Sequence, residues 1–154
     1  MKKIVIFGAG CHAKVVFSEI VNLKQYNILG FVDEFSEKGK VITKYKNKNF
    51  KNLGGLKNII KLKNYCGVIG VGSNHLRKKI YKQVNRVLKN FRWEKIISKN
   101  AMIAHNVQIG DGSVIISNCI INSGTRIEKH CLINTSSSID HDNIFEDFSG
   151  TGLV

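Results

Sequence analysis

The segment from Ile97 to Phe145 reads ISKNAM IAHNVQ IGDGSV IISNCI INSGTR IEKHCL INTSSS IDHDNI F, with isoleucine at every sixth residue up to Ile139. Phe145 keeps the step and Thr151 breaks it. The residue four places after each isoleucine is small or medium in size: Ala101, Val107, Ser113, Cys119, Thr125, Cys131, Ser137 and Asn143. A six-residue repeat is typical of a parallel β-helix, in which each repeat supplies a short strand and a turn, and the stacked coils share one core.

This segment resembles the hexapeptide repeat of left-handed β-helix acyltransferases. The resemblance implies that three hexapeptides form one triangular coil, that the crossovers are left-handed, and that the chain assembles as a homotrimer. Nine repeats from Ile97 would give about three coils. We therefore expect residues 97–154 to form a short left-handed parallel β-helix.

A second pattern lies at the amino terminus. Residues 2–7 form a short apolar run that leads into the turn Gly8-Ala-Gly10-Cys-His12. We expect a helix from about residue 12 to residue 23 and a second strand at residues 27–32. The core-facing helix residues would be Val15, Val16, Ile20 and Leu23. A buried strand, a glycine turn and a helix open a Rossmann-like unit, so residues 1–96 are predicted to bind a nucleotide-sized anion.

The acidic residues Asp33 and Glu34 follow the second strand. Gly-x-Gly-x-x-Ala followed by an acidic residue about 20 positions later is also the dinucleotide fingerprint, so an NAD-dependent enzyme is one alternative. Two observations oppose this alternative. The residues before the repeats can form only one short sheet, and the sequence after that sheet does not resemble an oxidoreductase substrate domain.

The chain also resembles sugar acetyltransferases of bacterial surface glycan synthesis, in Phe7-Gly-Ala-Gly-Cys-His-Ala-Lys-Val-Val16, in Gly30-Phe-Val-Asp-Glu34, and in Val71-Gly-Ser-Asn74 with Arg77. These include the acetyltransferase of the bacillosamine pathway and the sialic acid O-acetyltransferase-like proteins. The resemblance implies acetyl-CoA as co-substrate and a crevice that holds the UDP portion of a UDP-amino sugar. The substrate-binding residues would be Gly8, Gly10, His12, Asp33, Glu34, Gly72, Asn74 and Arg77. The alternatives are that His12 only begins its helix and that Asp33 and Glu34 only end a strand.

The middle of the chain supplies the rest of the predicted sheet. We expect a strand at residues 67–71 and an amphipathic helix at residues 75–89, capped by Ser73 or Asn74. Phe91, Trp93 and Ile96 alternate as a strand that leads into the repeats. The ends of the parallel strands would converge on one sheet edge, where ligands of open α/β sheets bind. Proline is absent, and we expect residues 39–50 to be mobile.

The chemistry of acyl transfer to an amine needs a base that removes a proton as nitrogen attacks the thioester. The stretch Asn134–Asp142 resembles the family segment that carries the catalytic histidine. This implies His141 as the base and Asp142 as its orienting partner. The alternative is an ordinary surface histidine. The other three histidines are interpreted as structural: His75, His105 and His130. No histidine pair has metal-ligand spacing, so we expect no metal.

Charge divides the chain in the same place as the motifs. Residues 1–99 hold 22 Lys or Arg against 5 Asp or Glu, whereas residues 100–154 hold 2 against 6. The lysines are spread singly and accompany no recognisable nucleic-acid-binding motif, which favours a solvated surface over a nucleic-acid partner. Such a surface would attract anionic substrates.

The cysteines and the hydropathy pattern bear on location. Four cysteines without a Cys-x-x-Cys pair favour reduced thiols, with Cys119 and Cys131 in the core. The apolar runs are too short for membrane insertion or a signal peptide, so we expect a cytoplasmic protein.

The last residues depart from the family pattern. Family members usually continue Asp-Phe-x-His-Ile-Ser and then add coils that form much of the acetyl-CoA site, whereas here Asp147-Phe-Ser-Gly150 precedes Thr151. Two hypotheses follow. The first is acetyl transfer to the amino group of a UDP-linked amino sugar, and the second is a truncated, catalytically inactive nucleotide-sugar-binding remnant.

Overall fold

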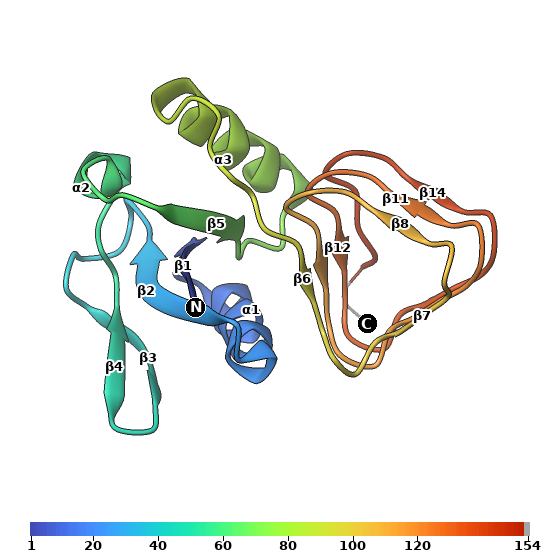
Figure 1. Cartoon of the computed structure of the whole chain (residues 1–154). Helices are drawn as coiled ribbons and strands as arrows, with labels where there is room; N and C mark the ends of the chain where they lie inside the picture. Colours follow the sequence, from blue (N-terminus) through green and yellow to red (C-terminus); the bar gives the residue numbers. More distant parts are fainter. Residues whose placement is uncertain (153–154) are drawn as a thin grey trace.

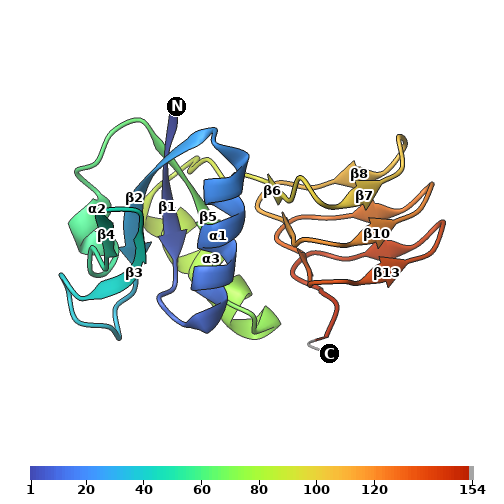
Figure 2. The ribbon, with the colours of Figure 1, turned by 90° about the horizontal axis from the view of Figure 1, so that it is seen from below.

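The computed structural model describes residues 1–152 and contains an α/β part followed by a parallel β-helix (Figure 1). The α/β part has a parallel sheet in the order β2-β1-β5, formed by β1 (Lys2–Phe7), β2 (Tyr26–Val32) and β5 (Tyr65–Ile69). Helix α1 (Cys11–Leu23) and helix α3 (Asn74–Val87) lie on its opposite faces (Figure 2). The predicted Rossmann-like arrangement is confirmed.

Strand β1 is apolar from Ile4 to Phe7 because both of its faces are buried there. Ile4 and Ile6 belong to the core cluster that contains α1, whereas Val5 and Phe7 belong to the cluster that contains α3. Successive strand residues point to opposite faces of a sheet, so a central strand covered by helices on both sides reads as one continuous hydrophobic run.

Helix α1 has the predicted extent, but its buried face is rotated from the predicted one. Ala13, Val16, Phe17 and Ile20 are buried, with the spacing of one helical face. Val15 was predicted on this face and is 40% exposed. The sheet and the neighbouring hairpin set the orientation of the helix, and Phe17 packs against Phe50 of that hairpin with ring centroids 4.7 Å apart.

The expectation of a mobile segment at residues 39–50 is corrected by the structure. Strand β3 (Val41–Tyr45) pairs antiparallel with β4 (Lys48–Lys51), and the one-turn helix α2 (Leu56–Ile59) follows. Ile42 and Phe50 are buried in the same core cluster as α1. These two contacts hold the hairpin against the domain, although its sequence is rich in lysine and asparagine.

Strand β5 ends two residues before the predicted end. Its pairing with β1 stops where Phe7 faces Ile69, because the next residue of the β1 chain is the glycine turn. Ser73 caps α3 by accepting a hydrogen bond from the Leu76 amide. The predicted strand through Phe91 and Trp93 is reduced to one parallel bridge between Gly67 and Trp93, where this segment lies beside β5 before it enters the β-helix.

The hexapeptide repeat forms nine two-residue strands within residues 1–152. Each strand ends on the repeat isoleucine, or on Phe145 in the last one. They are β6 (Ile96–Ile97), β7 (Met102–Ile103), β8 (Gln108–Ile109), β9 (Val114–Ile115), β10 (Ile120–Ile121), β11 (Arg126–Ile127), β12 (Leu132–Ile133), β13 (Ser138–Ile139) and β14 (Ile144–Phe145).

Three sheets line the sides of a triangular coil, in the orders β12-β9-β6, β13-β10-β7 and β14-β11-β8 (Figure 1). Ile97 pairs with Ile115 and Ile115 with Ile133, so one coil takes three hexapeptides, as predicted. The repeat isoleucines form one core cluster together with Cys119 and Cys131. The architecture is the expected left-handed parallel β-helix.

The turns of the β-helix share a backbone feature that the hexapeptide pattern did not predict. The third residue after the strand has a positive φ in seven consecutive turns of the described chain: Gly112, Asn118, Gly124, His130, Ser136, Asp142 and Phe148. Glycine, asparagine, aspartate and histidine are the residues that most often adopt this left-handed conformation, whereas Ser136 and Phe148 adopt it at a steric cost. The Phe148 ring packs on Tyr81 of the α/β domain, with ring centroids 5.3 Å apart.

The β-helix packs on the α/β domain through a single side of its triangle. The outward-facing residues of the sheet β12-β9-β6 are Ile96, Val114 and Leu132, and all three are buried in the cluster that contains α1. Glu19 of α1 accepts hydrogen bonds from the amide and hydroxyl of Ser117 at the same contact. The two other sides of the triangle face away from the domain (Figures 1 and 2).

Candidate functional site

A cavity of about 230 Å³ opens at the carboxyl ends of the parallel strands. Gly8 at the end of β1, together with Asp33 and Glu34 after β2, contributes to its wall. Helix α3 supplies the opposite wall through Leu76, Lys79, Ile80, Gln83 and Val84. The cavity is therefore the sheet-edge crevice that the sequence predicted, and three of the predicted substrate-binding residues line it.

The glycine turn leaves room for a ligand on one side and none on the other. Gly8 has φ +106°, and an added Cβ would lie 2.7 Å from Val71 Cγ2. Gly10 precedes α1, and a Cβ there would meet no atom of residues 1–152 within 4 Å. The turn thus presses against the loop after β5 through Gly8 and presents its open side, with the start of α1, to an anion.

Asp33 shapes this turn from the neighbouring strand. Its Oδ2 accepts a hydrogen bond from the Ala9 amide at 3.0 Å, and its Oδ1 accepts from the amides of Phe35 and Ser36 at 2.8 and 3.1 Å. Both carboxylate oxygens therefore bind backbone N–H groups of the chain itself. Glu34 is exposed beside the cavity and remains available to a ligand.

His12 lies half-buried in the first turn of α1, two residues after Gly10. Burial lowers the pKa of its imidazole, and the positive charge of Arg77 lowers it further. A neutral ring can donate one hydrogen bond and accept another, so His12 is suited to polar contact with a bound ligand without carrying charge.

The loop after β5 is tied to α3 by Arg77. Its Nη1 donates to the carbonyl oxygens of Gly72 and Val71 at 2.6 and 3.2 Å, and its Nη2 donates to Asn74 Oδ1 at 2.8 Å. Gly72 and Asn74 are exposed on this loop, as expected for ligand-binding residues.

The remaining donors of Arg77 reach the β-helix. Nε donates to the His130 carbonyl oxygen at 3.1 Å, and Nη2 also donates to those of Phe148 and Ser149 at 3.0 and 3.1 Å. The side chain is 3% exposed, and the acceptors around it in the described chain are carbonyl or amide oxygens. The structure thus gives Arg77 a different set of partners from the substrate contact predicted for it: it joins the two domains.

His130 forms the centre of an aromatic cluster at this joint. Its ring stacks on Phe148 at 5.1 Å with an interplanar angle of 4°, and it packs edgewise on Trp93 at 4.9 Å and tilted on Tyr81 at 4.6 Å. Burial lowers the pKa of His130 to about 4. The structural role assigned to His130 agrees with this position, but its burial between domains was not visible in the sequence.

His141 lies in an exposed turn between β13 and β14. Its Nδ1 is 2.8 Å from Asp142 Oδ2, and the Asp142 backbone is left-handed, with φ 57°. The hydrogen bond with Asp142, together with the negative charges of Asp140 and Asp142, raises the pKa of His141. A carboxylate at Nδ1 holds the proton on that nitrogen, which leaves Nε2 with a free lone pair. The predicted pair therefore has the geometry of an oriented general base.

Within one chain, the crevice lies in the α/β domain, which contacts one side of the β-helix, whereas His141 lies at the corner opposite that side. The α/β domain covers the sheet β12-β9-β6, whereas His141 is at the corner where the sheets of β13 and β14 meet, opposite that side (Figure 1). The structure places Gly8, Asp33 and Glu34 on one crevice, and it brings His141 and Asp142 together, but it does not join the two groups in one chain.

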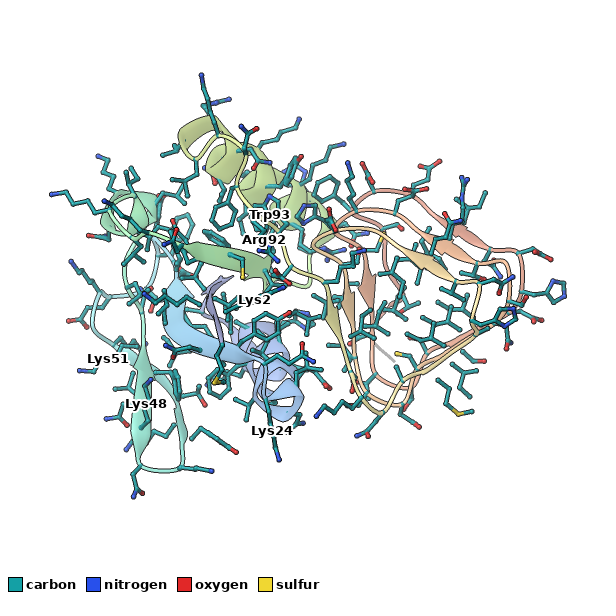
Figure 3. The ribbon with its side chains drawn as sticks, viewed as in Figure 1. Lys2, Lys24, Lys48, Lys51, Arg92 and Trp93 are labelled. Atoms are coloured by element: carbon teal, nitrogen blue, oxygen red, sulfur yellow. The ribbon has the colours of Figure 1, made fainter. Side chains whose placement is uncertain are left out.

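The basic residues are dispersed over the surface instead of forming one stripe. Figure 3 shows Lys24 at the end of α1, Lys48 and Lys51 on the hairpin, and Arg92 near the domain joint. Arg92 is paired with Glu94 at 2.9 Å, and Lys2 contacts the same carboxylate at 3.3 Å. This distribution agrees with the interpretation of the lysines as a solvated surface.

Among residues 1–152, the His, Cys, Asp and Glu side chains form no group of three that would ligate a metal ion. None of the helices in the same range combines the length and apolar character that a membrane crossing requires.

Comparison with known proteins places the chain beside sugar acetyltransferases. The family model described as the PglD N-terminal domain matches residues 3–84, which is more than half of the chain. No curated protein matches the chain. The solved acetyltransferase domain of PglB from Neisseria gonorrhoeae FA1090, in complex with acetyl coenzyme A, is 26% identical with a TM-score of 0.82, over 97% of this chain and 69% of that chain.

Two other solved structures have the same fold at lower identity. PerB from Caulobacter crescentus, in complex with CoA and GDP-perosamine, is 21% identical with a TM-score of 0.81, over 97% of this chain and 68% of that one. WeeI from Acinetobacter baumannii AYE is 19% identical with a TM-score of 0.77, over 97% of this chain and 69% of that one. Each likeness spans both the α/β part and the β-helix.

Proposed function

The chain belongs to the PglD N-terminal domain family, and we propose that it transfers the acetyl group of acetyl-CoA to the amino group of a nucleotide-linked amino sugar. The observation that carries this proposal is the contact of His141 Nδ1 with Asp142 Oδ2 at 2.8 Å, on the β-helix of a chain that also has a crevice at the carboxyl ends of its parallel strands. The similarity to an acetyltransferase domain that binds acetyl coenzyme A supports it.

In the proposed mechanism, His141 acts as the general base. Its Nε2 takes a proton from the sugar amine as the nitrogen attacks the thioester carbonyl carbon. The C–N bond forms, the C–S bond breaks, and CoA leaves as a thiol after its sulfur takes the proton from the His141 imidazolium. Asp142 keeps the Nδ1 proton in place and stabilises the imidazolium that forms during attack. An acyl-enzyme intermediate is not required, because both substrates meet in one ternary complex.

The crevice is proposed to hold the nucleotide portion of the acceptor. The open side of the turn at Gly8 and Gly10, with the start of α1 and the neutral ring of His12, would take the diphosphate. Glu34 lines this crevice, and Gly72 and Asn74 are exposed on the segment between Val71 and Leu76, which also line it. These three residues would contact the nucleoside and the sugar. Asp33 would act by shaping the glycine turn, since its oxygens already accept three backbone hydrogen bonds.

Uridine diphosphate is the nucleotide implied by the family motifs, and we propose a UDP-linked 4-amino-4,6-dideoxy sugar as the acceptor. Because one similar structure contains GDP-perosamine, a GDP-linked amino sugar is the comparison to test against it.

A homotrimer is proposed because one chain does not bring the crevice to His141. A second copy packed against the β-helix would supply the missing partner for each crevice. Met102 of β7 and Ile120 of β10 are exposed apolar residues on one of the two sides that face away from the α/β domain. Their burial between copies would give such an assembly a hydrophobic contact.

The second candidate is a nucleotide-sugar-binding protein that does not transfer acetyl groups. It is favoured by Thr151, which stands where the repeat would have isoleucine. Its hydroxyl accepts a hydrogen bond from the Asn134 amide at 2.8 Å and contacts Ser137 Oγ at 2.8 Å. This polar position interrupts the apolar ladder on the coil next to His141.

The deciding experiment follows release of the CoA thiol when the protein is mixed with acetyl-CoA and UDP- or GDP-linked amino sugars. We expect turnover with one of them, and its loss in His141→Ala. His105→Ala is the matched control, because His105 is an exposed histidine in the turn between β7 and β8, at the same corner of the triangle. Nucleotide-sugar binding without thiol release would establish the second candidate, and absence of both would refute the two proposals together.

A further inference from the structure

Phe35 is the most exposed aromatic side chain in the described part of the protein. It is 99% exposed, yet it lines the mouth of the crevice next to Asp33 and Glu34. Leu76, on the first turn of α3, is 46% exposed and lines the same cavity from the other element. Two large apolar side chains thus stand in water at a single opening, where they add nothing to the core of the chain.

The loop that carries Phe35 is held rigidly in this position. Asn52 is buried, and its Nδ2 donates to the carbonyl oxygens of Asp33 and Ser36 at 3.0 and 2.7 Å. Its Oδ1 accepts from the amides of Asp33 and Gly54, both at 3.1 Å. The amide of Phe35 itself donates to Asp33 Oδ1 at 2.8 Å. The ring therefore projects into solvent from a backbone that five hydrogen bonds fix.

The inner wall of the cavity is apolar, and its rim is polar. Val32, Leu56, Val71, Ile80 and Val84 line it, together with Phe7. Glu34, Lys79 and Gln83 provide acceptors and donors in the same lining. A planar group with two apolar faces and a polar edge matches this combination, and a nucleobase has that chemistry.

We propose that Phe35 and Leu76 form a clamp for the base of the bound nucleotide, with the Phe35 ring stacked on one face of the base. This inference rests on the proposed function, because it assumes that the crevice holds a nucleotide. The diphosphate would then lie toward Gly8 and Gly10, at the far side of Asp33 from Phe35. Glu34 and Gln83 would contact the polar edge of the base.

The clamp explains why a rigid loop keeps a phenyl ring exposed. Stacking on a ring whose backbone is already fixed costs less ordering of the protein than stacking on a ring of a mobile loop, so more of the contact is retained as affinity. An aromatic ring stacks on every base, whereas the polar rim distinguishes one base from another. Phe35 is accordingly expected to strengthen binding of UDP and GDP alike, and to leave the choice between them to Glu34, Lys79 and Gln83.

Isothermal titration calorimetry with UDP, and separately with GDP, tests the clamp on the full chain. Phe35→Ala is expected to weaken binding of the nucleotide that the wild type prefers by about tenfold, and Leu76→Ala by a smaller factor. Phe35→Trp should retain the affinity because it keeps a stacking ring. Tyr45→Ala is the matched control, since Tyr45 is an exposed aromatic residue of the hairpin outside the crevice.

The outcomes separate this inference from the proposed function. Wild-type affinity in Phe35→Ala, with thiol release intact, would overturn the clamp and leave the transferase proposal standing. An equal loss of affinity in Phe35→Trp would also overturn it, because stacking would then not be the cause. If the wild type binds neither UDP nor GDP, the clamp and the proposed function both fail.

Discussion

Arg77 Nε donates a hydrogen bond to the carbonyl oxygen of His130 at 3.1 Å, and this contact joins α3 to the second coil of the β-helix. The same guanidinium holds the loop after β5 and the turn at Phe148 and Ser149. One buried side chain therefore sets the position of a crevice loop relative to the coils that carry the proposed base.

Replacement of Arg77 by Gln is expected to destabilise the protein by about 2 kcal/mol or more, because several buried carbonyl groups lose their donor. Urea unfolding monitored by Trp93 fluorescence would measure the change. Arg86→Gln, at an exposed position of the same helix, should stay within about 0.5 kcal/mol of the wild type. Equal stabilities of the two variants would contradict the role given to Arg77.

Gly112→Ala is expected to destabilise the joint by roughly 2 kcal/mol, which is typical of overpacking combined with a strained φ. Gly112 has φ +75°, and an added Cβ would lie 2.3 Å from the His130 ring. Gly152→Ala serves as the control, since a Cβ there would meet no atom of residues 1–152 within 4 Å. A thermal shift that is the same for both variants would argue against tight packing of His130 on Gly112.

His130 should make stability depend on pH. Its pKa is about 4 in the folded protein and about 6.5 when unfolded, so the unfolded chain binds more protons between these values. The stabilising effect of the neutral ring is therefore complete above about pH 6.5 and falls as the pH drops toward 4, by about 3 kcal/mol in all. Its buried Nδ1 has no hydrogen-bond partner among residues 1–152, which adds to the cost of protonation.

Urea unfolding between pH 4 and 7 would measure this dependence. His130→Asn is expected to be less stable at neutral pH but to show a flatter pH profile, because the titrating group is gone. His75→Asn, at an exposed position, should keep the wild-type slope. A wild-type slope in His130→Asn would assign the dependence to other groups.

The proposed base predicts the acid limb of the rate profile. Because the pKa of His141 is raised, the imidazole becomes protonated at a pH above 6.5. As the pH is lowered, kcat/KM should therefore begin to fall before pH 6.5 is reached. Asp142→Asn removes the first cause of the shift, so the limb should move to lower pH while the rate falls. His141→Ala should lower kcat by about 10²- to 10⁴-fold. If the acid limb of the pH–rate profile stays in place in Asp142→Asn, Asp142 does not act as the orienting partner of His141.

Several features of the site were predictable because they depend on residues that are neighbours in the chain. The glycine turn after a buried strand indicated the crevice through Gly8 and Gly10. The pair His141 and Asp142 is adjacent in sequence, so its contact needs only the local turn. The isoleucine period indicated the coil because each repeat makes the same strand and turn.

Other features depend on contacts between distant segments. The buried face of α1 follows the hairpin at Phe50, which is why Val15 is exposed despite its apolar side chain. The hairpin itself was missed because only Ile42 and Phe50 anchor a lysine-rich segment. The acceptors of Arg77 in the β-helix lie about fifty to seventy positions away in the sequence, and no local pattern predicts them.

The sequence alone determined the two architectures, since periodic burial in a repeat and a glycine turn between a strand and a helix are both local consequences of side-chain size and backbone freedom. The tertiary structure decided which side of the triangular coil faces the α/β domain. That choice buries Ile96, Val114 and Leu132, directs Arg77 and His130 into the joint, and leaves His141 at the opposite corner. It depends on the complementarity of two surfaces formed by segments far apart in the chain, and such complementarity exists only once both parts have folded.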